Sequence, residues 1–248
     1  MYHYWMNKNK VIHAISGPRN ISTALMYSFA QRPNCEVIDE PFYAAYLKKK
    51  DLNHPGKTKT LKLYPNSFGG AIQRVQQFIS SSEAKEVYIK NMAQHMVDAN
   101  WDWAQEAIHV FWIRHPRKVI RSFSKVLKEV SLSDIGIEDQ VNQWKGIQKF
   151  SGPKIIVNSD EMLNEPEKTF PIICDAIGIP FFKEMLRWPQ GRKEYDGAWW
   201  PYWYSNVHKS SYFKKGSILG DPLEKKYSKI ETEALEYYTE LYHQRLVF

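Results

Sequence analysis

The sequence predicts an α/β fold with three layers, in which helices cover both faces of a mostly parallel five-strand sheet. Short apolar runs alternate along the chain with segments whose apolar residues recur at helical spacing. These runs are apolar throughout, as is typical of strands that are buried on both faces. We expect a single domain over residues 1–248, with a core over 10–182 and an irregular, aromatic-rich C-terminal cap with a closing helix over 183–248.

Each element has its own signal. The strands are expected at residues 11–15, 36–38, 87–89, 110–113 and 155–157. The helices are expected at 21–30, around 68–79, from Pro116 with Val119, Phe123, Val126 and Val130 on one face, at 170–177 and at 230–246. Proline suits a first helical turn, and Gly178 with Pro180 is typical of a helix end. Because ligands bind at the carboxyl ends of parallel strands, we expect residues 16–23, Asp39, Glu40, Lys90 and Arg114 at one rim.

Composition excludes several classes of protein. The chain is 43% hydrophobic and 15% aromatic, which is more than a disordered chain carries. No apolar run approaches the ~18 residues that span a bilayer, and the first residues lack the apolar core of a secretory signal. Cys35 and Cys174 lie far apart in sequence, which supports neither a disulfide framework nor a zinc site. We expect a cytoplasmic protein without a membrane span or a bound metal.

The net charge of +7 is compatible with three kinds of partner: nucleic acid, an anionic membrane surface or a polyanionic small molecule. The basic residues are spread along the chain, and the densest run, Lys48–Lys50, is short and typical of a solvated loop. Charge alone therefore does not favour nucleic acid, and we expect a small-molecule partner.

The first motif is Ser16-Gly17-Pro18-Arg19-Asn20-Ile21-Ser22-Thr23, at a strand-to-helix turn. Backbone N–H groups at a helix start favour a phosphate, and Arg19, Ser22 and Thr23 would add side-chain donors. The nucleotide-binding pattern G-x-x-x-x-G-K-[ST] is absent. The alternative is an ordinary helix start capped by Asn20 or Ser22.

The second motif is Arg114-His115-Pro116-Arg117, which closes a strand, with Ser122 eight residues after Arg114. A guanidinium at the strand end and a hydroxyl two turns into the next helix can bind one anion together. A magnesium-dependent NTPase would carry an aspartate at this strand end. The alternative is a surface arginine on a turn and an unrelated helical serine.

Together these motifs resemble the cytosolic-type sulfotransferases that use 3′-phosphoadenosine-5′-phosphosulfate (PAPS). Pro18–Thr23 resembles that family's P-K-S-G-T-T loop, which grips the 5′-phosphosulfate, and Arg114 to Ser122 is similar to its R-N-P-R/K…S element, which holds the 3′-phosphate. Ser159–Leu163 resembles its Y-E-D-L segment, and Gly178–Phe181 its G-x-P-F. The resemblance implies a P-loop-like fold. It also implies a donor site, which we assign to Gly17, Pro18, Arg19, Asn20, Ser22, Thr23, Arg114, Ser122, Lys214, Lys215 and Gly216.

The sequence departs from the family pattern in several places. Asn20-Ile21 stands where the family has Ser-Gly, and Ala24 replaces a Trp that stacks on adenine. Ser159 replaces the Tyr of Y-E-D-L. Lys214-Lys215-Gly216 resembles the R-K-G element of the 3′-phosphate site, but Gly220-Asp221 follows it one residue late.

The assignment of catalytic roles rests partly on the positions of the residues and partly on the resemblance to the family. Lys90-Asn91-Met92 resembles the family's K-T-H segment, which implies that Lys90 donates to the bridging oxygen as sulfate leaves, but Met92 holds the His position. Glu40 ends the second strand, where carbohydrate-type sulfotransferases have a catalytic Glu, and is our preferred base. His95 is the alternative base, since its ordinary pKa is near neutral. If these residues have only structural roles, Glu40 is a carboxylate at the start of a helix, and His95 is a histidine whose hydrogen bonds are met within the protein.

The resemblance implies transfer of a sulfuryl group from PAPS to a hydroxyl or amine of a small-molecule acceptor, with adenosine 3′,5′-bisphosphate as product. The aromatic run Trp199–Tyr204 either lines a pocket for an apolar or aromatic acceptor or packs onto the core or onto a partner in a homo-oligomer. Two other functions stay open. A P-loop kinase would need a Lys-Ser/Thr pair and a magnesium aspartate, which the motifs lack. A noncatalytic nucleotide-binding module is favoured by the changes at the adenine and His positions.

Overall fold

A sheet of five parallel strands, in the order β2-β3-β1-β4-β5, forms the centre of the computed structural model, which describes residues 9–125, 129–216 and 218–248. The strands are β1 (Lys10–Ser16), β2 (Cys35–Asp39), β3 (Glu86–Met92), β4 (Ile108–Ile113) and β5 (Lys154–Asn158). Every expected strand is confirmed. Strand β3 is longer than expected because Lys90 and Asn91 continue it in buried positions.

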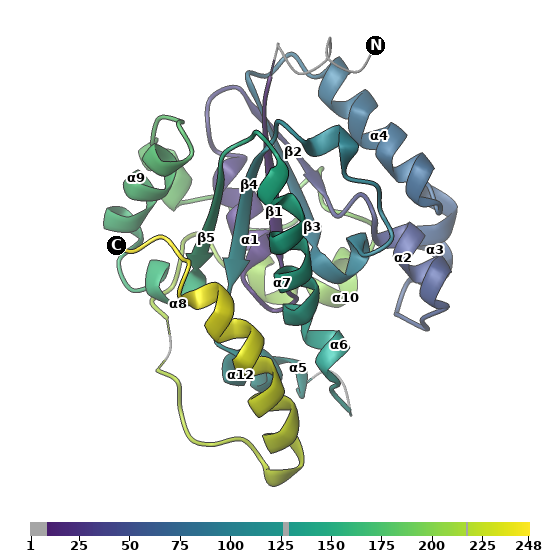
Figure 1. The fold of residues 1–248 in the computed structure, drawn as a ribbon. Coiled ribbons are helices and arrows are strands. Elements are labelled where there is room, and N and C mark those ends of the chain that lie inside the picture. The colour runs from purple at the N-terminus through teal and green to yellow at the C-terminus, as the bar shows by residue number, and fades with distance from the viewer. Residues whose placement is uncertain (1–8, 126–128, 217) are drawn as a thin grey trace.

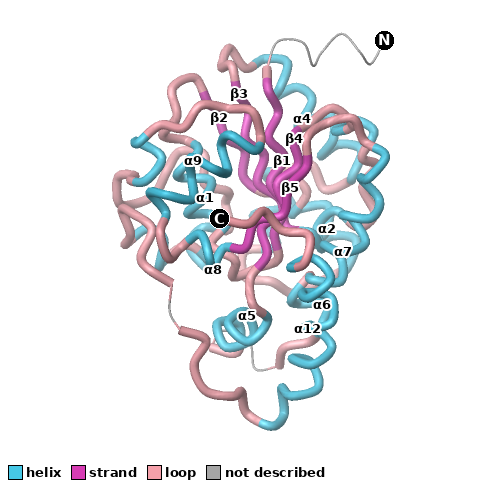
Figure 2. The backbone as a smooth tube through the Cα atoms, turned by 60° about the vertical axis from the view of Figure 1, so that its left-hand side comes forward, coloured by secondary structure: helices cyan, strands magenta, loops and turns pink. Residues whose placement is uncertain are grey.

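Helices cover both faces of this sheet, which confirms the three-layer prediction (Figures 1 and 2). They are α1 (Ser22–Phe29), α2 (Tyr43–Lys50), α3 (Lys57–Leu63), α4 (Phe68–Ser81), α5 (Pro116–Phe123), α6 (Leu132–Ile135), α7 (Ile137–Gly146), α8 (Ser159–Met162), α9 (Pro166–Ala176), α10 (Trp200–Trp203), α11 (Ser205–His208) and α12 (Ser228–Tyr242).

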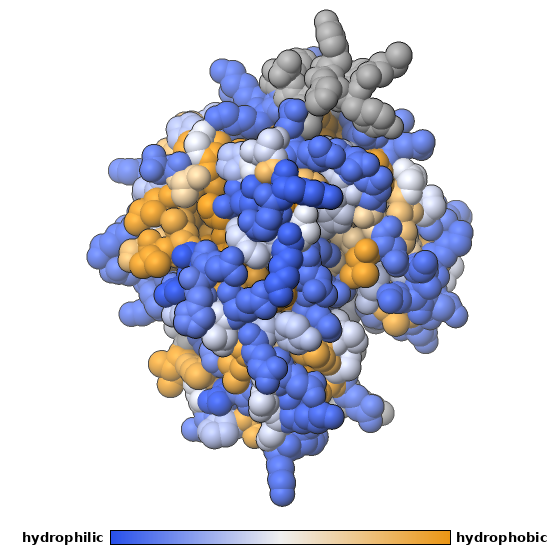
Figure 3. Space-filling view, viewed as in Figure 1, coloured by the Kyte–Doolittle hydropathy of each residue, from blue (hydrophilic) through white to orange (hydrophobic). Residues whose placement is uncertain are grey.

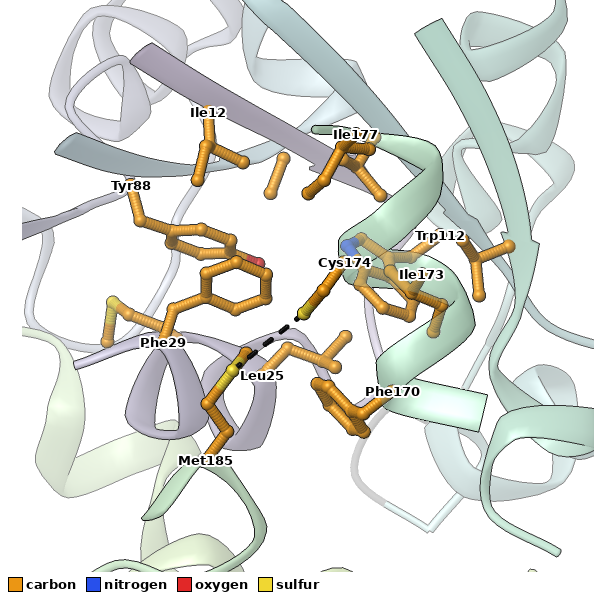
Figure 4. Close-up of a cluster of buried hydrophobic side chains, with 14 of the residues drawn as sticks. Ile12, Leu25, Phe29, Tyr88, Trp112, Phe170, Ile173, Cys174, Ile177 and Met185 are labelled. Carbon is orange, nitrogen blue, oxygen red and sulfur yellow. Dashed lines mark hydrogen bonds between the residues drawn. The ribbon is translucent and has the colours of Figure 1, made fainter. Parts of the chain in front are cut away.

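The alternation of side chains along each strand divides the core between the two faces. In β1, Ile12 and Ala14 pack against α1 and α9, whereas Val11 packs on the α4 side and Ile15 on the side of α7 and α12. Figure 4 shows the first of these faces, where Phe29 of α1 stacks on Tyr88 with 4.3 Å between ring centroids. Rings and branched side chains of α1 and α9 meet over the sheet and fix both helices against it.

Within the described residues, the structure corrects one helix and adds seven. The helix that begins at Pro116 ends at Phe123. Val130 is buried but lies beyond the end of this helix, so the prediction that Val130 belongs to the helix face is wrong. Val126 lies outside the described residues. Of the added helices, α6, α8, α10 and α11 have four residues each, and α2, α3 and α7 are longer. Helix α7 carries buried Ile137, Val141 and Trp144 at helical spacing, so its signal is present in the sequence. Helices α2 and α3 are shorter than α7 and rich in lysine.

The C-terminal region has the irregular character that its composition predicts. Between residues 187 and 213 the described backbone forms the short helices α10 and α11 and an isolated antiparallel bridge between Arg187 and Tyr212. The closing helix is confirmed as α12, which packs against α5 and α7 through Ala234, Tyr238 and Leu241. From here on, the cap means residues 187–213 alone, the irregular segment that precedes the closing helix.

The surface is mostly hydrophilic on the face drawn in Figure 3, with apolar side chains gathered on one side, over α9 and the C-terminal end. Exposed Ile172 and Val247 belong to these segments. Among the described residues, no helix combines the length and apolar character that crossing a membrane requires.

Two histidines pair across the centre of the sheet. His13 of β1 and His109 of β4 lie opposite each other with ring centroids 5.3 Å apart, and Trp101 and Trp103 pack on His13. Burial lowers the pKa of His109 to about 4. Burial, and then the neighbouring His109, hold the pKa of His13 well below its ordinary value. Both rings are therefore neutral in the folded protein at neutral pH.

These histidines should make stability fall on acidification. An unfolded histidine binds a proton near pH ~6.5, whereas folded His109 resists protonation down to about 4, so the unfolded state gains protons first and is favoured as the pH drops through this window. We expect His109→Gln to make the pH dependence of the unfolding free energy shallower by up to ~1.4 kcal/mol per pH unit, measured by urea unfolding. The exposed His243→Gln is the control. An unchanged slope in His109→Gln would contradict this account.

Candidate functional site

A cavity of about 530 Å³ lies beyond the carboxyl ends of the strands and brings together distant parts of the chain. This volume lies within the range of small-molecule and cofactor sites. Most of the residues expected from the sequence line it: Pro18, Arg19, Asn20, Ser22, Thr23, Glu40, His95, Arg114, Ser122, Lys214, Lys215 and Gly216. Gly17 and Lys90 lie behind the cavity wall. The topology thus gathers at one rim residues that the chain separates by up to about 200 positions.

The loop between β1 and α1 has an unusual backbone. Arg19 (φ 59°) and Ile21 (φ 50°) both adopt left-handed conformations, and Ile21 is the N-cap of α1. A β-branched residue at positive φ is strained, at a cost of ~1–3 kcal/mol. Ile21 therefore takes the conformation that glycine would adopt easily. Within the described part of the chain, the backbone N–H groups of residues 19–24 donate to no protein acceptor, so the loop offers unpaired donors to an anion.

Two residues of this loop serve the scaffold. A Cβ on Gly17 would lie 2.5 Å from the carbonyl oxygen of Ile135, so only glycine allows this close approach. The Asn20 amide is buried, donates to the Trp112 carbonyl and accepts from the Ser159 hydroxyl at 2.6 Å. Asn20 thus ties the loop to β4 and to the start of α8. Its side chain holds the loop's shape, although the residue also lines the cavity.

Two arginines meet at the cavity wall. Arg19 Nε donates to the Ser122 hydroxyl at 2.9 Å, and Arg114 Nη1 donates to the Arg19 carbonyl at 2.9 Å. Arg114 Nε also donates to Asp160 at 3.2 Å. Burial, and then the charge of Arg114, lower the pKa of Arg19. Two guanidiniums so close together repel each other, and an anion between them would relieve that repulsion.

The segment after the cap adds further positive charge. Lys214 and Lys215 line the cavity, and the Gly216 N–H donates to the Leu163 carbonyl at 3.3 Å. A Cβ on Gly216 would lie 3.4 Å from the Asp160 carbonyl oxygen. The Ser159–Leu163 segment therefore supports both Arg114, through its Asp160 side chain, and the Lys214–Gly216 turn, through its backbone.

Glu40 stands where β2 ends, with a left-handed φ of 39° and its N–H bonded to the Lys90 carbonyl at 2.9 Å. Its Oε1 accepts from Lys90 Nζ at 2.5 Å. Its Oε2 lies 3.7 Å from His95 Nδ1, which is beyond hydrogen-bonding distance, and accepts no hydrogen bond from the described residues. One carboxylate oxygen is thus anchored, and the other is available to a molecule in the cavity.

Lys90 is buried and fully engaged by the protein. Its Nζ donates to Asp39 Oδ1 at 2.8 Å, to Glu40 Oε1 and to the Tyr204 hydroxyl at 2.8 Å. These three acceptors account for all three ammonium protons. Burial would lower the pKa of Lys90, but the charges of Asp39 and Glu40 outweigh it and raise that pKa. In this arrangement Lys90 faces the carboxylates, and no proton remains for a leaving oxygen.

Asp39, expected at this rim, and Tyr204, part of the aromatic run, join this group, although the sequence analysis assigned neither of them a role in catalysis. Asp39 lies opposite Lys90 in the β2–β3 register, and its Oδ2 accepts from the Tyr204 hydroxyl at 2.7 Å and from the Gly197 N–H at 2.9 Å. Burial raises the pKa of Asp39. The position of Asp39 directly before Glu40, at a strand end, was the available signal. For Tyr204 only its place in an aromatic run pointed to the site.

His95 is held between aromatic rings. Its ring stacks on Tyr43, with centroids 4.8 Å apart, and lies 4.6 Å from Tyr46. Burial, and then the charges of Lys90 and His54, hold the pKa of His95 well below its ordinary value. A neutral imidazole with such a low pKa is a weak proton acceptor at neutral pH.

The aromatic run 199–204 divides between packing and the cavity. Trp199 is buried against Tyr43, with centroids 5.0 Å apart, whereas Trp203 and Tyr204 line the cavity. Trp199 therefore packs onto the core, and that Trp203 and Tyr204 face an acceptor stays a prediction. The cavity wall also includes Ala24, whose small side chain leaves room, and the rings of Trp188 and Phe213, which meet edge to face at 4.8 Å.

Across residues 9–125, 129–216 and 218–248, no group of three or more His, Cys, Asp or Glu side chains is arranged to hold a metal ion. Among the described residues, the charged groups on the cavity wall are the Arg19–Arg114 pair, the two lysines of the 214–216 turn and the carboxylate of Glu40. The arrangement can bind a polyanion and, in the same cavity, accept a proton.

Comparison with known proteins gives a consistent result. Residues 10–242 match the model of a family described as a sulfotransferase domain. The chain is 34% identical over 205 residues to the branched-chain-amino-acid aminotransferase-like protein 2 of Arabidopsis thaliana, covering 82% of this chain and 36% of that protein. The related protein 1 of the same plant is 34% identical over 209 residues, covering 84% and 37%. The chain thus spans little more than a third of the length of these curated relatives.

Solved structures share the fold at low sequence identity. The sulfotransferase domain of the Synechococcus PCC 7002 olefin synthase aligns with a TM-score of 0.53 at 17% identity, covering 97% of this chain and 98% of that one. A sulfotransferase from Alicyclobacillus acidocaldarius aligns with a TM-score of 0.51 at 12% identity, covering 96% and 97%. These likenesses confirm the predicted P-loop-like α/β fold. The match of the family model over residues 10–242 shows that this protein belongs to the sulfotransferase domain family.

Proposed function

We propose that this protein transfers a sulfuryl group from PAPS to a hydroxyl or amine of a small-molecule acceptor. One observation carries the proposal: a single cavity holds both an arginine pair beside unpaired backbone N–H groups and a carboxylate with one free oxygen. The first feature suits a polyanionic donor, and the second suits removal of the acceptor's proton. A noncatalytic module would need only the first.

The cavity residues fit the donor. Arg19, the N–H groups of residues 19–24 and the hydroxyls of Ser22 and Thr23 would hold the 5′-phosphosulfate, because they combine positive charge with donors that the described residues leave unused. Arg114 and Ser122, with Lys214 and Lys215 nearby, would hold the 3′-phosphate. Trp188 and Phe213 are aromatic candidates for the adenine, since Ala24 and Ser159 stand where the family has rings. The volume of about 530 Å³ suits a nucleotide-sized ligand.

The reaction needs a base and stabilisation of developing charge. When bound, PAPS supplies the sulfuryl group and a good leaving group. Glu40 takes the acceptor's proton on its free Oε2 as the new S–O or S–N bond forms and the donor's S–O bond breaks. Arg19 and the loop N–H groups stabilise the negative charge left on the departing phosphate.

The role of Lys90 changes from the one that resemblance implied. Because its three protons are donated to Asp39, Glu40 and Tyr204, Lys90 holds the base in position and balances its charge. We therefore propose that Lys90 positions Glu40, and that the loop and Arg19 carry the charge of the leaving group. His95 remains the alternative base, but its low pKa favours Glu40.

The acceptor's class follows from the same wall. The rings of Tyr43, Trp203 and Tyr204 line the cavity together with Glu40, and His54 lies 2.9 Å from the Tyr43 hydroxyl. Burial lowers the pKa of His54, as it does that of His95, so these two rings add no positive charge. An apolar or aromatic acceptor with one reactive hydroxyl or amine suits these walls.

The 3′-phosphate assignment can be tested by binding. Arg114→Ala should weaken binding of adenosine 3′,5′-bisphosphate by ~10–100-fold more than binding of adenosine 5′-phosphate, because a charge-assisted contact contributes ~1.5–3 kcal/mol. Isothermal titration calorimetry measures both affinities. Arg117→Ala is the matched control, because it removes an equal charge from an arginine that pairs with Glu231. Equal losses for the two ligands would place Arg114 away from the 3′-phosphate.

The base can be tested by turnover with PAPS. Glu40→Gln keeps the side chain's shape but removes the proton acceptor, so kcat should fall by ~10²–10⁴-fold while bisphosphate affinity is unchanged or slightly higher. Glu161→Gln, a carboxylate paired with Arg245 and outside the cavity wall, should keep normal turnover.

Two other results would redirect the proposal. A normal Glu40→Gln beside an inactive His95→Asn would make His95 the base. Bisphosphate binding without turnover of any alcohol, phenol or amine acceptor would favour a binding module.

A further inference from the structure

The cap reaches the catalytic carboxylate through one hydroxyl. Tyr204 belongs to the cap, whereas Asp39, Glu40 and Lys90 belong to the ends of β2 and β3. All four residues are buried, with relative exposures from 1% for Lys90 to 7% for Glu40. We propose that Tyr204 and Asp39 are positioning residues, through which the seated cap holds Lys90 so that its ammonium anchors the Glu40 carboxylate. This inference rests on the proposed role of Glu40.

The hydrogen-bonding capacity of the Tyr204 hydroxyl is completely used. It donates to Asp39 Oδ2 at 2.7 Å, with Glu40 Oε1 farther away at 3.5 Å, and it accepts from Lys90 Nζ at 2.8 Å and from Trp199 Nε1 at 3.0 Å. A phenolic oxygen has one proton to donate and two lone pairs to accept with. Burial, and then Asp39 and Glu40, raise the pKa of Tyr204 well above its ordinary value, so the hydroxyl keeps its proton. Tyr204 is therefore a fixed, neutral link between an ammonium and a carboxylate.

Charge explains why Lys90 needs this link. One ammonium lies between two buried carboxyl groups, so Asp39 and Glu40 compete for the same positive charge. Asp39 would draw Lys90 away from Glu40 if its own oxygens lacked other donors. The Tyr204 hydroxyl and the Gly197 N–H both donate to Asp39 Oδ2, which leaves Oδ1 for Lys90. The cap thus supplies the hydrogen bonds of Asp39 Oδ2, which allows Lys90 to bond to Glu40 as well as to Asp39 Oδ1.

Geometry restricts the ammonium further. Its three protons are directed at three acceptors on different elements, and the acceptor that lies on the cap is Tyr204. Without the hydroxyl, one ammonium proton would be buried without a partner, and Lys90 would turn to recover it. Glu40 Oε1 would then lose a fixed partner, and the free Oε2 would no longer hold one orientation.

The test removes the hydroxyl alone. We expect Tyr204→Phe to lower kcat by ~10–100-fold, the range for losing a hydrogen bond to a charged group, while the affinity for adenosine 3′,5′-bisphosphate stays within twofold. Tyr64→Phe is the matched control. Its hydroxyl also holds the cap, accepting from the Ala198 N–H at 3.1 Å, but it makes no contact with Asp39, Glu40 or Lys90. It should leave kcat nearly normal.

A second comparison separates positioning from folding. If Tyr204 acts through Glu40, then Tyr204→Phe should lower kcat no more than twofold when it is added to Glu40→Gln, because the group that it positions is already gone. If Tyr204→Phe instead damaged the fold, its loss of kcat and that of Glu40→Gln would multiply in the double variant. Equal losses in Tyr204→Phe and Tyr64→Phe, or full multiplication in the double variant, would overturn the proposal.

A readout without turnover keeps this inference distinct from the proposed function. The ¹³C NMR signal of the Asp39 carboxyl group can be assigned because it is lost in Asp39→Asn. In Tyr204→Phe this signal should titrate at a higher pH than in the unmodified protein, because the charged form of Asp39 has lost a hydrogen-bond donor. It should not move in Tyr64→Phe. A shift in a protein that turns over no acceptor would support the link while refuting the enzyme. An unmoved signal in an active enzyme would refute the link alone.

Discussion

A buried ammonium between two carboxylates is the interaction on which the site depends. Lys90 is 1% exposed, and it is tolerated there because Asp39, Glu40 and Tyr204 accept all of its protons. Each partner comes from a different part of the structure: the end of β2, the turn after it and the cap. Parallel pairing of β2 with β3 brings Asp39 opposite Lys90, so the sheet register itself builds the pair. The same ammonium then fixes one oxygen of Glu40 and leaves the other free.

The anion site that we propose depends on a second constraint, the strained loop after β1. Arg19 and Ile21 hold left-handed conformations that neither residue prefers. Asn20 makes this possible by bonding to the Trp112 carbonyl and the Ser159 hydroxyl, and Gly17 by its close approach to Ile135. The loop thus directs unpaired N–H groups toward the cavity at an energetic cost that the surrounding contacts offset. A loop that leaves its N–H groups unpaired can therefore be built here without the glycine that the related pattern has at Ile21.

Sequence patterns predicted the sheet well because they depend on local burial. The five strands are apolar runs that lie in the middle of the molecule, and helices α1, α4, α9 and α12 have apolar residues at regular spacing. Helices α2 and α3 escaped prediction because they are short and lysine-rich, so their periodicity is weak. The end of α5 at Phe123 was missed because buried Val130 continues the apolar spacing beyond the helix. The spacing of apolar residues indicates which residues are buried, and a residue such as Val130 can be buried without belonging to a helix.

By itself, the sequence determined the five strands and the longer apolar helices between them, and it placed polar residues at the strand ends. It also determined the kinds of groups present: arginines and hydroxyls for an anion, and a carboxylate for a proton. Those features follow from local spacing and from the rule that parallel strands end at one rim. Only the tertiary structure decided what each group touches. It turned Lys90 toward Asp39 and Glu40, enclosed His95 between tyrosines and brought Tyr204 from 164 residues away to within 3.5 Å of Glu40. The reason is physical: hydrogen bonds and charge pairs act over a few ångströms, and those distances are set by packing between segments that are far apart in the chain.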